Sequence, residues 1–417
     1  MTTLLRDRGV RAFLMIWVGQ LVSLIGSGMT ALAIGIQVYQ QTESAARFTL
    51  MTFCAAAPPL IVLPLAGPLI DRWSRRRLLM GCDFIAASAT CLVAWMARGD
   101  HLSLPLSCLV VAVMAIATAL QWSIHAALVT TLVPREQLGR ASGLTQMANG
   151  ISMILAPLLG GALLPVIGLS GIAWIDLATF GVSILMLSMA PDAHGPASPR
   201  RHSASYREDV LFGLRYIFGR RDLTALLLMF TAVSFFTEMA AVLFTPLVLS
   251  LSTPAALGTI LSIGSVGMLS GGALMGVWGG PRRPALGAVA FAALGGAGVA
   301  MVGLTRSVPL LAAAAMVYFF CEPLMLGCNL VVWQRTVPAE LQGRVFVTRS
   351  MTAASAMPLA SLVAGPLADR VGVPIIFVTM GSLSIFTALL AWTSEPLRRL
   401  DEAAVVSPAP DPAGATT

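Results

Sequence analysis

Long apolar stretches alternate with short polar segments along almost the whole chain. Twelve stretches are long enough to cross a bilayer, whose hydrocarbon core of about 30 Å needs roughly 20 apolar residues in a helix. They span residues 13–39, 47–70, 78–97, 104–131, 145–167, 172–190, 223–249, 255–279, 285–304, 308–333, 350–368 and 374–393. The pattern predicts an all-α integral membrane protein with twelve transmembrane helices.

The arginines between these stretches predict the orientation of the chain. All 26 basic residues are arginine, and only Arg47, Arg98, Arg306 and Arg370 fall on the side opposite the N-terminus. Because positive residues concentrate on the cytoplasmic side, we expect both termini in the cytoplasm, in a multi-pass protein of the bacterial inner membrane. The first stretch is longer than a signal-peptide core, so we interpret it as a retained helix.

Composition excludes several classes of protein. The chain is 57% hydrophobic and 11% charged, whereas a soluble domain averages about 25% charged residues. The lack of lysine excludes a Walker-type phosphate loop, and neither H-E-x-x-H nor G-x-S-x-G occurs. No two cysteines have C-x-x-C spacing. We therefore expect no enzyme activity, metal site, cofactor or nucleic-acid partner.

One long polar linker divides the chain into two sets of six helices. Residues 1–190 form the first half, 191–222 the cytoplasmic linker, 223–395 the second half, and 396–417 a tail rich in Ala and Pro that we expect to be disordered. In the linker, Ser205 and Glu208 form a capping box before an apolar face that predicts an amphipathic helix at the inner surface. A fully solvated linker is the alternative.

The two halves carry an internal repeat. The segment V-P-R-E-Q-L-G-R at 133–140 matches V-P-A-E-L-Q-G-R at 337–344, and Gly161 and Gly168 stand in the same register as Gly365 and Gly372. The segment G-P-L-I-D-R at 67–72 recurs as G-P-L-A-D-R at 365–370. Parallel repeats of this kind characterise secondary transporters, whose substrate site lies where the halves meet near the membrane midplane.

Over residues 11–395 the chain resembles the Major Facilitator Superfamily. The segment G-P-L-I-D-R-W-S-R-R-R at 67–77 is similar to the superfamily's motif between the second and third helices. The resemblance implies two parallel six-helix halves that transport by alternating access. It also implies a latch on the cytoplasmic side, with Asp71 against a helix N-terminus and arginines pairing across the half-interface. Its residues are Gly67, Asp71, Arg72, Arg75, Arg76 and Arg77. A loop that only sets topology is the alternative.

A second motif on the fifth helix indicates the direction of transport. Gly143, Pro157, Gly160 and Gly161 follow the spacing of the superfamily's antiporter motif, with Ser152 and Ala156 replacing two glycines. By resemblance this motif marks exporters, and ordinary close helix packing is the alternative. The segments at 208–216 and 334–345 are similar to the macrolide-efflux and enterobactin-exporter branch. Relatives often carry an acid in the first helix and an arginine near the end of the fourth, where Ser27 and His125 stand here.

Four carboxylates fall inside predicted spans, where a charge costs roughly 2.5 to 3.5 kcal/mol on insertion scales. Asp83 and Asp176 lie close to helix ends, and we expect structural roles for them. Glu238 and Glu322 each lie about 15 residues into a helix, near the midplane. Burial there favours the protonated form, so these two are the candidates for proton coupling. A structural hydrogen bond between helices is the alternative.

Aromatic residues beside the two glutamates indicate a largely apolar substrate cavity. The candidates are Phe235, Phe236, Tyr318 and Phe319. Together these features predict a monomeric secondary exporter that exchanges protons for hydrophobic small molecules of the drug, macrolide or siderophore type. A proton-coupled uptake symporter of the same fold is the alternative.

Overall fold

The computed structural model describes residues 8–72, 74–99, 103–133, 137–190 and 206–395, and regular structure within these ranges is entirely helical. Eleven of its helical segments are long and apolar enough to cross a membrane. The first part of the linker and the predicted disordered tail lie outside the described residues.

The first half contains five helices that make six crossings. They are α1 (Arg8–Thr42), α2 (Ala45–Arg72), α3 (Arg75–Arg98), α4 (Leu104–Leu132) and α5 (Leu138–Met189). At about 1.5 Å per residue, the 52 residues of α5 are too long for one crossing. Gly168 interrupts the helix with φ 66° and ψ 177°. Both arms of α5 return to α1, where Gly28 faces Ala156 and Gly26 faces Thr179, so α5 is a hairpin of two spans.

The second half repeats this arrangement. It contains α7 (Arg221–Val242), α8 (Phe244–Leu251), α9 (Pro254–Trp278), α10 (Pro284–Leu304), α11 (Val308–Thr336), α12 (Ala339–Ala354), α13 (Ala356–Val371) and α14 (Val373–Thr393). The helices α7 and α8 form one span with a break at Leu243, and α12 and α13 form another with a break at Ser355. The two halves therefore provide the twelve predicted crossings.

The eleventh span begins earlier than predicted. The sequence places its start at residue 350, but α12 begins at Ala339. Its first turns are polar because they pack against the linker helix α6 (Tyr206–Phe218) rather than lipid. Gly213 of α6 lies against Thr348 of α12, and the Arg344 guanidinium is 5.3 Å from the centre of the Phe212 ring.

The amphipathic helix predicted in the linker corresponds to α6. Ile217 on its apolar face is fully buried among residues of the second half. Arg220, which follows α6, donates to Asp222 at 2.7 Å and to the carbonyl of Thr336 at 3.5 Å. These bonds fix the end of the linker to the start of α7 and the end of α11.

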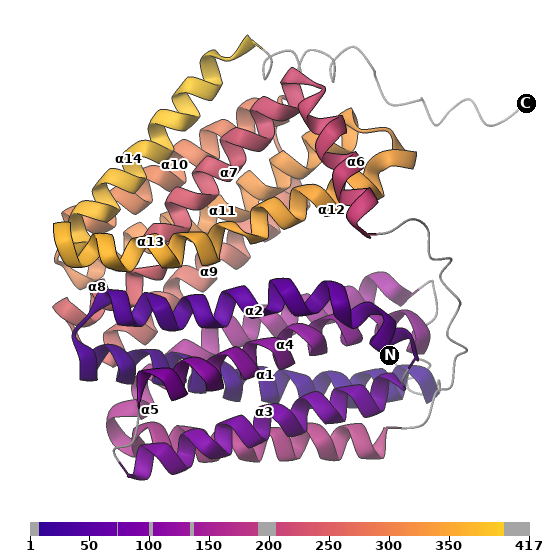
Figure 1. Cartoon of the computed structure of the whole chain (residues 1–417), viewed down its shortest axis with the longest axis vertical. Helices are drawn as coiled ribbons and strands as arrows, with labels where there is room; N and C mark the ends of the chain where they lie inside the picture. Colours follow the sequence, from indigo (N-terminus) through magenta and orange to yellow (C-terminus); the bar gives the residue numbers. More distant parts are fainter. Residues whose placement is uncertain (1–7, 73, 100–102, 134–136, 191–205, 396–417) are drawn as a thin grey trace, which may run out of the picture.

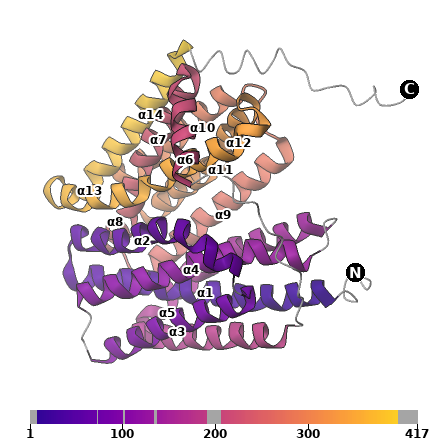
Figure 2. The same ribbon diagram turned by 45° about the vertical axis from the view of Figure 1, so that its right-hand side comes forward.

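The two halves form two separate bundles that lie side by side (Figures 1 and 2). We call the side on which α1 begins and α14 ends the inner side, following the arginine distribution, and the opposite side the outer side. The turn between α1 and α2, the bend at Gly168 and the end of α8 lie on the outer side. The helices α6 and α12 lie toward the inner side.

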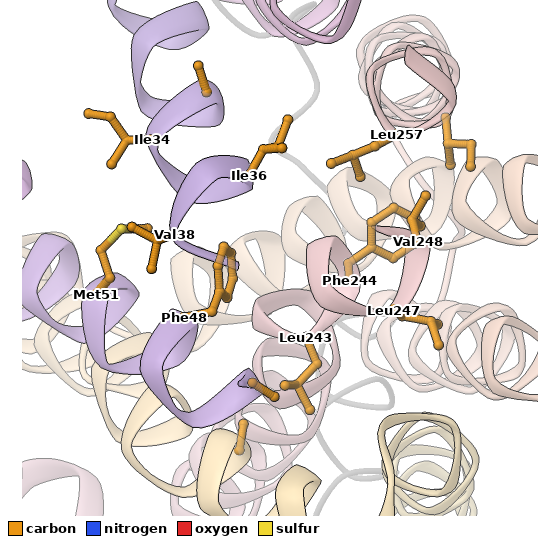
Figure 3. Packing of buried hydrophobic residues seen from close by; sticks show 14 of the residues in the cluster. Ile34, Ile36, Val38, Phe48, Met51, Leu243, Phe244, Leu247, Val248 and Leu257 are labelled. Atoms are coloured by element: carbon orange, nitrogen blue, oxygen red, sulfur yellow. The ribbon is translucent and has the colours of Figure 1, made fainter. Parts of the chain in front are cut away.

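The buried core joins the halves on one side only. A single cluster of buried residues draws on the outer parts of helices from both halves, including Ile36 of α1, Phe48 of α2, Val248 of α8 and Leu257 of α9. Figure 3 shows these side chains directed toward one another across the interface. On the inner side the buried residues form two clusters, one within each half. Among the described residues, the halves therefore share a core at the outer side and not at the inner side.

Close backbone contacts between α5 and α9 hold the outer side together. A Cβ atom on Gly161 would lie 2.5 Å from the carbonyl oxygen of Pro254 and 3.0 Å from the Cα of Gly258. Farther along the same pair of helices, Ser262 and Ser265 donate to backbone carbonyls of α5 at 2.8 and 2.7 Å. These contacts end before the inner end of α5, where a Cβ atom on Gly143 would meet nothing within 4 Å.

A second close approach joins α2 and α13 on the outer side. Gly365 of α13 lies directly against Ala46 and Thr49 of α2, with no room for a side chain. Ser44, just before α2, donates to the carboxylate of Asp369 at 3.2 Å. With the outer side closed by two helix pairs and the inner clusters separate, the structure is an inward-open conformation.

The contact at Gly161 gives a test of this closure. Gly161→Val places methyl groups where α9 backbone atoms now lie, and overpacking of this kind typically costs about 1 to 3 kcal/mol. We expect the outer side to open. In a protein without native cysteines, Ile36→Cys, which is buried in the shared core, should then react several-fold faster with a membrane-impermeant maleimide added from outside.

Gly181→Val is the matched control, because Gly181 lies on the same helix and a Cβ atom there meets nothing within 4 Å. Equal labelling of Ile36→Cys in the Gly161→Val and Gly181→Val proteins would contradict the proposed role of Gly161 in outer closure.

Candidate functional site

Glu238 and Glu322, the two predicted proton-coupling residues, lie in one cavity. Glu238 is on α7 and Glu322 on α11, and both side chains line a space of about 150 Å³. Water occupies about 30 Å³ per molecule in the liquid, so this space holds a few waters or one small polar group.

No arginine or histidine is among the residues that line the described cavity. Besides the two carboxylates, its ionisable groups are the Tyr318 hydroxyl and the Cys321 thiol, and Thr237 and Ser234 add further hydroxyls. Two carboxylates without a cation are expensive in a low-dielectric surrounding when both are charged. A proton or a cationic ligand in this cavity would remove that cost.

The cavity lies within the second half rather than between the two halves. Its walls come from α7, α10, α11 and the last turn of α12, where Ala353 contributes. From α10 the wall is provided by small residues, including Gly295 and Gly296. The sequence placed each acid near the midplane of its helix but did not indicate that they share a cavity, and it placed the substrate site at the half-interface.

The four predicted cavity aromatics divide into two groups. Tyr318 lines the carboxylate cavity, and together with Phe319 it lines a second space of about 90 Å³ toward the outer side. Their ring centres are 5.1 Å apart. Phe235 and Phe236 have ring centres 6.1 Å apart and pack against the shared outer core. Neither lines the carboxylate cavity.

The antiporter motif lies at contacts of α5 with both halves. Pro157 and Gly161 face Gly258 of α9 across the half-interface, whereas Gly160 faces Met29 of α1 within the first half. Gly143, at the inner end of the motif, has open space beside it. The small residues of the motif therefore allow α5 to approach α9 closely on the outer side.

The predicted latch is only partly within the described residues. Gly67, Asp71 and Arg72 belong to the end of α2, and their side chains lie outside the described part of the structure. Arg76 donates to the carbonyls of Ser188 and Ala190 at the end of α5. These bonds cap a helix of its own half, and the pairing of the latch arginines across the half-interface stays a prediction. Arg75 and Arg77 lie in the first turn of α3, whose cap residue Ser74 accepts from the Arg77 amide at 3.4 Å.

Asp83 and Asp176 are buried in networks of hydrogen bonds within the first half. Asp83 accepts from the Gln121 amide of α4 and from the Ser183 hydroxyl of α5, the latter at 2.8 Å. Gln20 of α1 in turn donates to Ser183 at 3.3 Å. The Asp83 network thus connects four spans, which agrees with the structural role expected from the sequence.

The Asp176 network contains the residue that replaces the family's first-helix acid. Ser27 donates to Asp176 at 3.2 Å, and Thr90 and Thr179 donate to it at the same distance. The sequence contained the serine and the acid but no signal that they meet, because they are 149 positions apart. A carboxylate in the sixth span thus lies against the first helix.

Comparisons with known proteins agree with this architecture. The sequence profile of the Major Facilitator Superfamily matches residues 16–361. The chain belongs to the Major Facilitator Superfamily. As a member of this superfamily it is a multi-pass membrane transporter rather than a member of an enzyme family, and its twelve-span fold in two parallel halves agrees with the resemblance found in the sequence.

The curated relatives of this superfamily member include drug exporters. It is 27% identical to macrolide efflux protein A of Streptococcus pyogenes, over 93% of this chain and 97% of that protein. It is also 27% identical to the multidrug efflux pump Tap of Mycobacterium tuberculosis, over 94% of each chain. Among solved structures, a bacterial homologue of the human lysosomal transporter Spinster matches with a TM-score of 0.65 at 15% identity, covering 96% of this chain and 99% of that chain.

The Asp83 network makes a prediction about stability. Asp83→Asn replaces one carboxylate oxygen with an NH₂ group. That group would face Gln121 or Ser183, which both act as hydrogen-bond donors to Asp83. A buried polar group without its partner costs about 1 to 3 kcal/mol. We expect a lower unfolding temperature in detergent, measured by intrinsic fluorescence during heating.

Ser88→Ala is the control, because the Ser88 hydroxyl is exposed and donates to the Phe84 carbonyl of its own helix. A fully stable Asp83→Asn protein that has lost transport would contradict a structural role and assign Asp83 to coupling.

Proposed function

We propose that this chain is a secondary exporter of hydrophobic small molecules, of the drug, macrolide or siderophore type, driven by proton antiport. The observation that carries the proposal is the cavity that Glu238 and Glu322 both line, with no arginine or histidine among its described lining residues. Membrane-embedded carboxylates that can exchange a proton for a cationic or polar ligand are a recurrent feature of proton-driven transporters. The names of the two curated relatives support export of macrolides and other drugs.

Each glutamate has a distinct place in this proposal. Glu322 is followed by Pro323, which removes a backbone hydrogen bond from the preceding turn of α11. Glu238 lies on α7, five residues before the break at Leu243 between α7 and α8. Both helices are therefore able to change shape beside their acid, and we assign proton uptake and release to the pair, with Glu322 as the main site.

The arrangement of the two halves supports alternating access. The inward-open conformation gives substrates a path from the cytoplasmic side or the inner leaflet. To close the inner side, the two clusters of buried residues on that side, one in each half, must come into contact. To open the outer side, the cluster that both halves share must separate. We infer that both termini are cytoplasmic and that the protein works in the inner membrane as a monomer.

Transport into everted membrane vesicles tests the proposal. With an interior-acid pH gradient, wild-type vesicles should accumulate a labelled macrolide, a lipophilic cation or a catecholate siderophore, and a protonophore should abolish the accumulation. Glu322→Gln mimics the protonated acid and should lose at least about tenfold of the gradient-driven rate. It should retain exchange of substrate for substrate, because that reaction needs no proton transfer.

Glu43→Gln is the control for this variant, since Glu43 lies in the exposed turn between α1 and α2, away from the cavity. Accumulation that resists the protonophore would refute proton coupling. A Glu322→Gln rate equal to that of Glu43→Gln would remove Glu322 from the mechanism, and no accumulation of any compound would refute export of this substrate class.

A further inference from the structure

A partly buried arginine lies next to the carboxylate cavity. Arg349 is on α12, ten residues after the start of this helix at Ala339, which is about 15 Å along its axis. Its guanidinium carbon is 5.7 Å from the centre of the Phe230 ring. Its Nε atom is buried and has no hydrogen-bond partner among the described residues. Within the described residues, the interaction shown for this guanidinium is the cation–π contact with Phe230.

The position of Arg349 links it to the two glutamates. Phe230, over which the guanidinium lies, is itself part of the cavity wall, and so is Ala353, one helical turn beyond Arg349 on α12. An arginine side chain extends several ångströms and carries its charge on a flexible stem. Among the described residues, the cavity wall thus holds two carboxylates and no arginine or histidine, and Arg349 lies beside that wall with no carboxylate shown against it.

The charged and titratable groups around this arrangement are few. The cavity wall receives Glu238 from α7, none from α10, and Tyr318, Cys321 and Glu322 from α11. The helices that pack against α12 are α6, α7 and α13. Among the described side chains, α6 adds Arg215 and Tyr216, α7 adds Arg221 and Asp222 at its inner end, and α13 adds Asp369 and Arg370 at its outer end.

We propose that Arg349 is the counter-ion of the Glu238–Glu322 pair: in the inward-closed conformation its guanidinium leaves the Phe230 ring and pairs with a carboxylate that has lost its proton. The inference rests on the proposed function of this cavity. A nearby cation favours the charged form of a carboxylate, so Arg349 promotes release of the proton. When the acid is protonated again, the guanidinium returns to the Phe230 ring.

The break in the eleventh span gives this exchange a structural route. The helix α12 ends at Ala354 and α13 begins at Ala356, with Ser355 between them. Movement of α12 at this joint carries Arg349 toward α11 and narrows the inner mouth of the cavity. Because α6 is packed on α12, the linker helix moves with it. Arg349 thus acts as a positioning residue that connects the charge of the cavity to the inner opening.

The test compares Arg349 with a matched arginine of the same helix. Arg344 also lies over an aromatic ring, that of Phe212, at 5.3 Å. Unlike Phe230, Phe212 does not line the carboxylate cavity, and Arg344 does not line it either. The variants are Arg349→Gln, Arg349→Lys and Arg344→Gln, each as purified full-length protein. The first readout is the export rate in proteoliposomes as a function of pH on the cytoplasmic face.

We expect Arg349→Gln to move the midpoint of this pH profile upward by about one unit, which is a tenfold change in the proton equilibrium. Arg349→Lys should stay near the wild type, since it keeps the charge, and Arg344→Gln should not move the midpoint. In a Glu322→Gln, Glu238→Gln background, Arg349→Gln should have no further effect. An unchanged midpoint, or an equal shift in Arg344→Gln, would overturn the proposal.

A second readout does not depend on transport. The infrared absorption of protonated carboxyl groups is followed during a pH titration of the detergent-solubilised protein. Bands that are missing in the Glu238→Gln and Glu322→Gln variants are assigned to these two residues. Arg349→Gln should extend their protonated range to higher pH. If wild-type export resists a protonophore but this titration shifts, proton-driven export fails and the counter-ion role stands. If export is proton-driven and the titration does not shift, only the counter-ion role fails.

Discussion

The shared core on the outer side is the constraint on which the rest of this conformation depends. It forms because two pairs of helices, α5 with α9 and α2 with α13, approach until backbone atoms touch at Gly161, Gly258 and Gly365. Without a hydrophobic driving force inside the bilayer, such close contacts and the hydrogen bonds beside them supply the association of the helices. On the inner side each half buries its own residues, so the halves can separate there without exposing a common core.

The buried carboxylates of the two halves have different surroundings. In the first half, Asp83 and Asp176 receive hydrogen bonds from several spans and act as fixed points of the bundle. In the second half, Glu238 and Glu322 share a cavity, and hydroxyls and a thiol are the polar groups near them. Satisfied polar networks rigidify a structure and unsatisfied ones are costly, so the two aspartates stabilise the first half, and the second half is where we propose that the charge changes.

Much of the fold could be predicted from the sequence because the membrane imposes a strong and simple pattern. Ten of the twelve spans start within about five residues of the predicted position, and the exceptions are the fifth span, which begins at Leu138, and the eleventh. The eleventh was wrong because its polar beginning, which includes Gln342 and Arg344, packs on α6, and hydropathy does not register contacts between helices. The backbone turn at Gly168 was predicted only as a short gap between spans.

The candidate site was less predictable than the fold. The depth of Glu238 and Glu322 in their helices made them candidates, because a charged carboxylate far from both helix ends is costly inside a bilayer. Depth gives no information on rotation about the helix axis, so the sequence assigned all four aromatic residues to the substrate cavity. In the structure Tyr318 lines the carboxylate cavity, whereas Phe235 and Phe236 pack against the outer core. Arg349 gave no signal either, since an arginine near a helix start resembles the topogenic arginines of the loops. Its significance arises only when α12 is folded against α7, where the guanidinium meets the wall of a cavity that contains two acids.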